Sequence, residues 1–167
     1  VCYNFMPVFD WTRTDLAKVR PDGATVLAYD QKVVDTIDPQ TFFDQTNDNS
    51  NGFVMPGWEP ERLAKVKELF KAYESVDEDT LFNNLVYFLK RIQGVCEKWG
   101  IKMAIHPDDP AWPVFNLPRI ITSKEKILKL MKAADAPFNG LTFCAGSFGS
   151  NPNDDLPGIV RALPGRV

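Results

Sequence analysis

The sequence predicts an α/β fold in which parallel strands alternate with helices, and a (β/α)8 barrel is the best match. Apolar runs of strand length alternate with amphipathic helical segments, which is the order expected of right-handed βαβ units. No strand candidate is followed by a G-x-G-x-x-G fingerprint or a Walker loop, which argues against a nucleotide-binding doubly wound sheet. The strand candidates are too few to close a barrel. We therefore expect an incomplete central portion of one, forming a single partial domain over residues 1–167.

Composition and charge exclude several classes of protein. With 44% hydrophobic and 25% charged residues, the 167-residue chain has the composition of an ordinary globular domain. A formal net charge of -3 without a basic stripe argues against a nucleic-acid partner. No apolar run is long enough to cross a membrane, and the first residues lack the pattern of a signal peptide, so we expect a cytoplasmic protein. The three widely spaced cysteines indicate reduced thiols rather than a disulfide framework.

The first part of the chain contains one clear strand candidate and a long irregular segment. Val1–Phe9 is apolar on both faces, as a central parallel strand would be. Residues 14–57 form an insertion in which Val26–Tyr29 and Val33–Val34 could be short strands. A segment of this length between regular elements is usually a functional lid or disordered.

Two helices are predicted next. Glu59–Glu74 carries apolar residues at helical spacing. Glu78–Lys98 has the stronger pattern, with Asp77 placed to cap its start and Gly100 to end it. These two segments are expected to lie between the first strand and the next strand of the sheet.

The last part of the chain continues the alternation. A helix over Lys124–Ala134 is predicted to begin with a capping box at Thr122-x-x-Glu125. The buried strand Gly140–Cys144 follows, and it is succeeded by a Gly-rich turn. A short final helix is expected over Asp154–Leu163. Because the chain starts inside an apolar strand and stops after a helix, we expect it to be a piece of a longer polypeptide.

Two potential metal ligands stand at the exits of consecutive strands. His106, the only histidine, ends the apolar run that starts at Lys102, and Cys144 ends the next strand. The carboxyl ends of parallel strands share one edge, and neighbouring strands are about 4.8 Å apart, so the two side chains could share one divalent ion. An imidazole and a thiolate suit a transition metal. The alternatives are a histidine satisfied by a local hydrogen bond and a cysteine that fills the core.

Three further residues are candidates for substrate binding. Arg13 follows the first strand and could bind a carboxylate, although a loop arginine can equally form a surface ion pair. Asp108 could support His106 or contact sugar hydroxyls, or it could only shape the proline-flanked turn. Ser147 lies in the Gly-rich turn, where an anion could bind; a turn that needs small residues is the other interpretation.

Three blocks of the sequence resemble the mannonate dehydratase family. They are YNFMPVFDWTR at 3–13, MAIHPDDP at 103–110 and NGLTFCAGS at 139–147. The resemblance implies a xylose-isomerase-like TIM barrel and a hydro-lyase that converts D-mannonate to 2-keto-3-deoxy-D-gluconate and water in hexuronate catabolism. It further implies Mn²⁺ or Fe²⁺ as cofactor, with His106 and Cys144 as two of the metal ligands. The remaining ligands and the acid and base residues of the family belong to segments beyond Val167.

Two other functions stay open from the sequence. A sugar isomerase or epimerase of the same barrel superfamily is one, although such sites favour carboxylate and histidine ligands over cysteine. The other is a non-catalytic barrel fragment, in which the side chains of His106 and Cys144 would not converge. The expected partner is a small sugar acid, without nucleic acid or membrane, and a homo-oligomer remains open. Alone, the chain would expose unpaired strand edges, so we do not expect it to fold independently.

Overall fold

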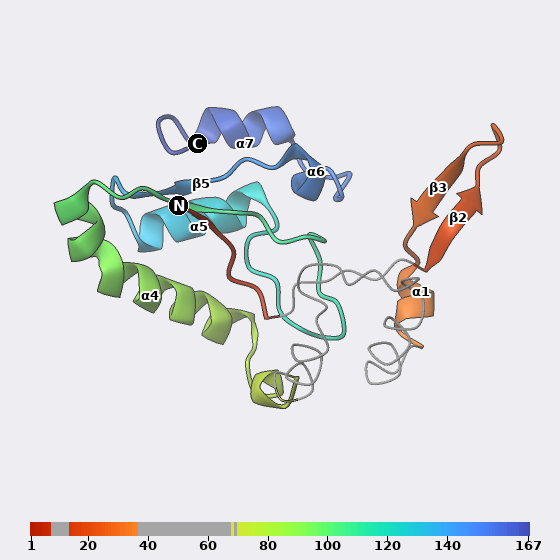
Figure 1. Cartoon of the computed structure of the whole chain (residues 1–167), viewed down its shortest axis with the longest axis horizontal. Coiled ribbons are helices and arrows are strands. Elements are labelled where there is room, and N and C mark those ends of the chain that lie inside the picture. Colours follow the sequence, from red (N-terminus) through yellow and green to blue (C-terminus); the bar gives the residue numbers. More distant parts are fainter. Residues whose placement is uncertain (8–13, 37–67, 69) are drawn as a thin grey trace, which may run out of the picture. The chain divides into compact units, whose positions relative to one another are not determined.

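The computed structural model describes residues 1–7, 14–36, 68 and 70–167 (Figure 1). The chain forms two compact units. The first comprises Val1–Pro7, Ser75–Pro113 and Leu117–Val167, and the second comprises Val8–Glu74 and Val114–Asn116. The first unit contains the two predicted metal ligands.

The first unit is built on a parallel sheet of three strands in the order β1-β4-β5. These strands are β1 (Cys2–Tyr3), β4 (Met103–Ile105) and β5 (Asn139–Leu141), and both pairings are parallel. The predicted alternation of helices with parallel strands is confirmed in this unit. Each strand is shorter than the apolar run that predicted it.

The backbone of Arg166 continues the hydrogen bonding of the sheet beyond β5. The amide of Leu141 donates to the Arg166 carbonyl at 2.6 Å. The Arg166 guanidinium donates to the carbonyls of Ala136 at 2.8 Å and Asn139 at 2.9 Å, and it pairs with Asp135 at 2.6 Å. Arg166 therefore ties the end of the chain to the loop that leads into β5.

Gly140 makes this close approach possible. A Cβ at this position would lie 2.6 Å from the carbonyl oxygen of Arg166, which is backbone and cannot rotate away. We expect Gly140→Ala to lower the free energy of unfolding by about 1–3 kcal/mol, the usual cost of overpacking. Urea denaturation of the longest expressible form of the protein measures it. The control is Gly94→Ala in α4 (Glu78–Trp99), where a Cβ meets nothing within 4 Å and the helix should gain up to about 1 kcal/mol. Equal stabilities would contradict the close approach.

The helices of this unit follow the predicted pattern, with one correction at a cap. In α4, Asp77 caps the start by accepting from the Thr80 amide at 2.8 Å, and Gly100 ends the helix with φ 63°, as predicted. The helix α5 spans Lys124–Ala133, and its cap is Ser123 rather than the predicted Thr122. Ser123 accepts from the Lys126 amide, so the capping-box prediction was wrong by one residue.

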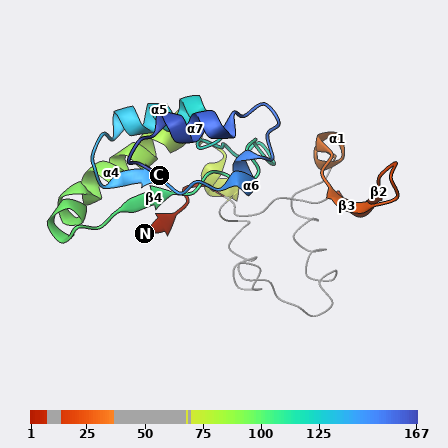
Figure 2. The same cartoon turned by 90° about the horizontal axis from the view of Figure 1, so that it is seen from above.

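Two short helices complete the first unit. The helix α6 (Ala145–Phe148) occupies the predicted Gly-rich turn, and α7 (Leu156–Ala162) lies within the predicted final helix. In Figure 2, α5 and α7 lie on the same side of the strands, and α4 packs against α5. Fully buried aliphatic side chains from strands and helices fill the space between them; they include Ile105, Leu141, Leu85, Leu89, Ile127, Leu130 and Ile159.

The described part of the second unit contains a hairpin and a short helix. The strands β2 (Asp15–Val19) and β3 (Thr25–Ala28) pair antiparallel, and Gly23 has φ 82° in the turn between them. The β3 strand was predicted at Val26–Tyr29, whereas β2 was not predicted. The strand predicted at Val33–Val34 was wrong: these residues end α1 (Gln31–Val34), which Asp30 caps. Of the helix predicted over Glu59–Glu74, residues 68 and 70–74 are described; residues 68 and 70–73 are helical, and residue 74 lies in a turn.

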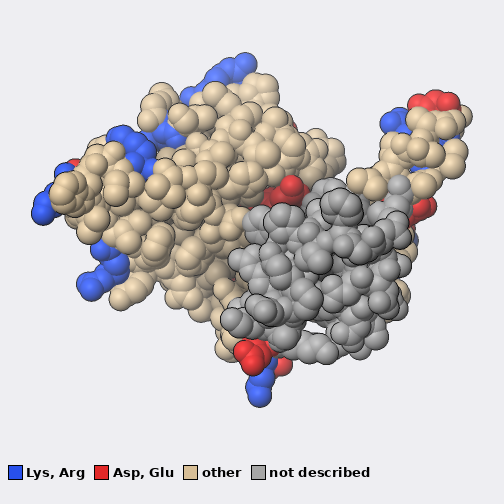
Figure 3. Space-filling model, in the orientation of Figure 1, with Lys and Arg blue, Asp and Glu red and all other residues tan. Residues whose placement is uncertain are grey.

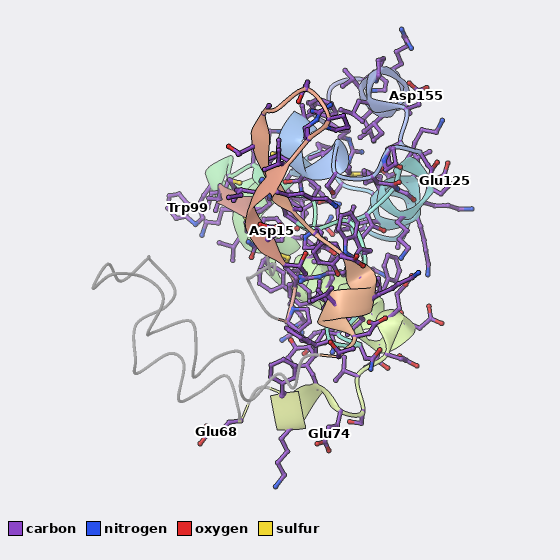
Figure 4. The ribbon with its side chains drawn as sticks, turned by 90° about the vertical axis from the view of Figure 1, so that its right-hand side faces the viewer. Asp15, Glu68, Glu74, Trp99, Glu125 and Asp155 are labelled. Carbon is purple, nitrogen blue, oxygen red and sulfur yellow. The ribbon has the colours of Figure 1, made fainter. Side chains whose placement is uncertain are left out.

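In the part of the chain that the structure describes, no helix is both long and apolar enough to cross a bilayer. On the face drawn in Figure 3, Lys and Arg side chains of the first unit occur in several separate places. Trp99, which ends α4 and is 69% exposed, and Glu125, in the first turn of α5, project outward from the first unit (Figure 4).

Candidate metal centre

His106 directly follows β4, and its surroundings select one tautomer. Its amide donates to the Tyr3 carbonyl at 2.6 Å, which continues the pairing of β4 with β1. Its ring atom Nδ1 lies 2.7 Å from the Pro107 carbonyl oxygen. Because a carbonyl oxygen only accepts, Nδ1 carries the hydrogen of that bond, and in the neutral ring Nε2 keeps its lone pair. A backbone carbonyl that orients a histidine in this way is typical of metal ligands.

Cys144 was predicted to end a strand, but it lies at the N-cap position of a helix, without a capping hydrogen bond from its side chain. β5 stops at Leu141, and Cys144 is the N-cap residue of α6. The pKa of its thiol is lowered to about 7, first by hydrogen bonds with the hydroxyl and the amide of Ser147, and also by the His106 side chain. The half-buried thiol therefore lies beside His106, and it loses its proton more readily than an ordinary cysteine.

The structure thus brings together the two predicted ligands from two consecutive βα loops. A neutral imidazole nitrogen with a free lone pair and an easily ionised thiol are donors that fit a divalent transition metal. Among the residues that the structure describes, no three His, Cys, Asp or Glu side chains are grouped as a complete metal site requires. The donor types of His106 and Cys144 suit a divalent transition metal, but two ligands alone do not complete a site within the described residues.

Ser147 is buried beside Cys144. It is 1% exposed, and its Oγ lies 3.3 Å from the Sγ of Cys144 and 3.3 Å from the Oδ2 of Asp109. The peptide bond between Asp109 and Pro110 is cis. The observed partners of Ser147 are therefore protein side chains, and its contact with a substrate stays a prediction.

Asp108 is fully buried, and its carboxylate accepts hydrogen bonds from two backbone amides. Its Oδ2 accepts from the amides of Ile120 at 2.7 Å and Ile121 at 3.0 Å. Burial raises the pKa of the Asp108 carboxyl, and the two amides and the positive charges of Arg119 and Lys126 oppose the rise. The contacts that the structure shows join the loop after β4 to the segment before α5. The role of Asp108 in substrate binding stays a prediction.

Two arginines complete the picture of the predicted and observed site residues. Arg13, predicted to bind the substrate carboxylate, lies outside the described residues. Arg119 was not predicted: it is 1% exposed, and its Nη1 lies 2.7 Å from the Sδ of Met6. The sequence signal was an arginine directly before the apolar pair Ile120–Ile121. An arginine that is buried with such a pair usually has an interaction partner.

Comparison with known proteins gives consistent results. The sequence model of the D-mannonate dehydratase (UxuA) family matches residues 1–167. A mannonate dehydratase from Brachyspira hyodysenteriae is 65% identical over 167 residues, which is 100% of this chain and 47% of that protein. One from Geobacillus thermodenitrificans is 56% identical over 161 residues, 96% of this chain and 43% of that protein.

A solved structure supports the same relationship. The crystal structure of mannonate dehydratase from Streptococcus suis serotype 2 superimposes with a TM-score of 0.72 at 38% identity, covering 96% of this chain and 40% of that one. The chain therefore spans about half the length of the curated relatives that it matches. Both the sequence and the α/β fold of the chain are similar to those of mannonate dehydratases.

Proposed function

The chain belongs to the mannonate dehydratase family, and we propose that the protein containing it converts D-mannonate to 2-keto-3-deoxy-D-gluconate and water. The observation that carries the proposal is the position of Cys144 beside His106, in the loops that follow two neighbouring strands, within a chain that matches the family throughout. The family resemblance also supports a cytoplasmic location and a role in hexuronate catabolism.

We propose that the whole protein is a (β/α)8 TIM barrel and that residues 1–167 form part of its wall. Three observations support this architecture. The sheet is parallel, α5 and α7 lie on one side of it, and the backbone of Arg166 continues its hydrogen bonding beyond β5. In such barrels the βα loops at the carboxyl ends of the strands build the active site, and these are the loops that carry His106 and Cys144.

The reaction requires removal of the proton next to the carboxylate and departure of the hydroxyl on the following carbon. A divalent ion, Mn²⁺ or Fe²⁺, would supply Lewis-acid stabilisation of the charge that develops on the substrate carboxylate. His106 would hold it through Nε2 and Cys144 through Sγ. The Pro107 carbonyl keeps the lone pair of Nε2 available by binding Nδ1–H. Arg13 remains the predicted partner of the substrate carboxylate, and Asp108 and Ser147 remain predicted substrate contacts.

An isomerase or epimerase of the same superfamily is the alternative, and the product distinguishes it. The longest expressible form of the protein should be incubated with D-mannonate and Mn²⁺, and the product analysed by mass spectrometry and ¹³C NMR. The proposal predicts a keto-deoxy acid lighter than the substrate by one water, and no such product after chelation of the metal. A product of unchanged mass would indicate isomerisation or epimerisation instead.

A further inference from the structure

One buried hydroxyl connects the two loops that carry the proposed metal ligands. Cys144 is the N-cap residue of α6 and precedes Ser147, in the first turn of this helix, by three residues. Asp109 lies on the loop after β4, three residues beyond His106. The Oγ of Ser147 is 3.3 Å from both the Cys144 sulfur and the Asp109 carboxylate. We call this Cys144–Ser147–Asp109 arrangement the serine bridge.

The serine bridge has little freedom to rearrange. Ser147 is 1% exposed, so its hydroxyl hydrogen must go to the sulfur or to the carboxylate rather than to bulk water. A thiol can donate its own hydrogen to Oγ while the hydroxyl donates to Asp109. A thiolate has no hydrogen to donate and can only accept from the hydroxyl. Ser147 can therefore accept a hydrogen bond from the thiol or donate one to the thiolate.

A second link between the same loops gives a comparison. The Oγ of Ser150 donates to the Ser147 carbonyl at 2.7 Å and accepts from the Ala111 amide at 3.4 Å. This link also joins the loop after β4 to α6, but its contacts do not include the sulfur. Both Ser147 and Ser150 thus join the loop after β4 to α6. Of the two, only Ser147 contacts Cys144, the proposed metal ligand.

We propose that Ser147 is a positioning residue whose hydroxyl holds the Cys144 sulfur in the orientation in which it shares a divalent metal ion with His106. The inference rests on the proposed function, because it presupposes a metal held by these two side chains. Partners that orient a metal ligand typically change metal affinity by about 10–100-fold when they are removed. Ser147 would act on the metal through Cys144, which is a role different from a substrate contact.

The test compares two serine-to-alanine variants with Co²⁺ as the probe. Cobalt bound to a thiolate gives a sulfur-to-metal charge-transfer absorption that reports on the sulfur, and competition with a chelator gives the affinity. We expect Ser147→Ala to shift this absorption and to weaken Co²⁺ binding by about 10–100-fold. Ser150→Ala should match the wild type in both measurements. Thermal unfolding of each variant checks that the fold is retained.

A second variant keeps the test valid if Ser147→Ala does not fold. Asp109→Asn preserves size and can donate an amide hydrogen to Oγ, which directs the hydroxyl hydrogen to the sulfur; the charge-transfer absorption should shift while Co²⁺ remains bound. A wild-type absorption that neither Ser147→Ala nor Asp109→Asn changes would overturn the serine bridge and leave the metal site intact. A wild type that binds Co²⁺ without any thiolate absorption would overturn both this inference and the assignment of Cys144.

Discussion

Replacing His106 by alanine in the longest expressible form of the protein is expected to lower metal-dependent turnover of D-mannonate by more than about a thousandfold. A bound metal contributes several kcal/mol of charge stabilisation to such a reaction, and each 1.4 kcal/mol is about tenfold in rate. The turnover should fall because the variant lacks a metal ligand: the Pro107 carbonyl binds Nδ1–H of His106 and leaves the Nε2 lone pair available for the metal. Steady-state kinetics and metal analysis of the purified variant measure both effects.

The control for this variant removes an exposed aromatic ring far from the proposed site in the sequence, that of Tyr87. Tyr87 on α4 is 66% exposed, and Tyr87→Ala should keep turnover within about twofold of the wild type. Near-normal activity and metal content in folded His106→Ala would show that His106 is not a ligand. The local hydrogen bond to Pro107 would then be its whole role.

The second large effect is expected for stability, at Asp108. Asp108→Ala removes the acceptor of two buried backbone amides, those of Ile120 and Ile121. Each unsatisfied buried donor costs about 1–3 kcal/mol, so the free energy of unfolding should fall by roughly 2–6 kcal/mol. Asp108→Asn keeps an oxygen at the same place and should lose less. Urea denaturation of the wild type and both variants gives the differences.

A surface aspartate provides the comparison. Asp79 in the first turn of α4 is 82% exposed in its side chain and pairs with Lys129 at 3.4 Å. Exposed ion pairs contribute about 0–1 kcal/mol, so Asp79→Ala should change stability far less than Asp108→Ala. If the two alanine variants were equally stable, the amide contacts of Asp108 would not be important for joining the loops.

Elements with complete local signals could be predicted from the sequence. The apolar spacing of α4 and its two caps, Asp77 and Gly100, lie within or next to the helix, and its bounds came out within one residue. The cap of α5 could not be decided in the same way. Thr122 and Ser123 are neighbours of the same chemical type, and only the backbone path determines which one accepts the amide hydrogen.

Elements that depend on distant partners were harder to predict. The apolar residues of Gly140–Cys144 continue past the point where β5 stops pairing, so periodicity alone placed Cys144 on a strand. Val33 and Val34 are typical strand residues, but Asp30 caps a helical turn over them, and local capping outweighs their weak propensity.

The candidate site shows the same division. His106 and Cys144 could be predicted to meet because parallel strands end at one edge, whatever the details of the loops. The serine bridge could not be predicted, since it depends on where the loop after β4 places Asp109. The partners of Asp108 were missed for a similar reason: they are backbone amides that any residue could provide.

The most direct test of the metal assignment is a crystal structure of the longest expressible form with a zinc ion bound, located by anomalous scattering at the zinc edge. The account predicts one peak about 2.0–2.1 Å from the Nε2 of His106 and about 2.3 Å from the Sγ of Cys144. A peak bonded to neither atom, or no peak in a protein that dehydrates D-mannonate, would contradict it.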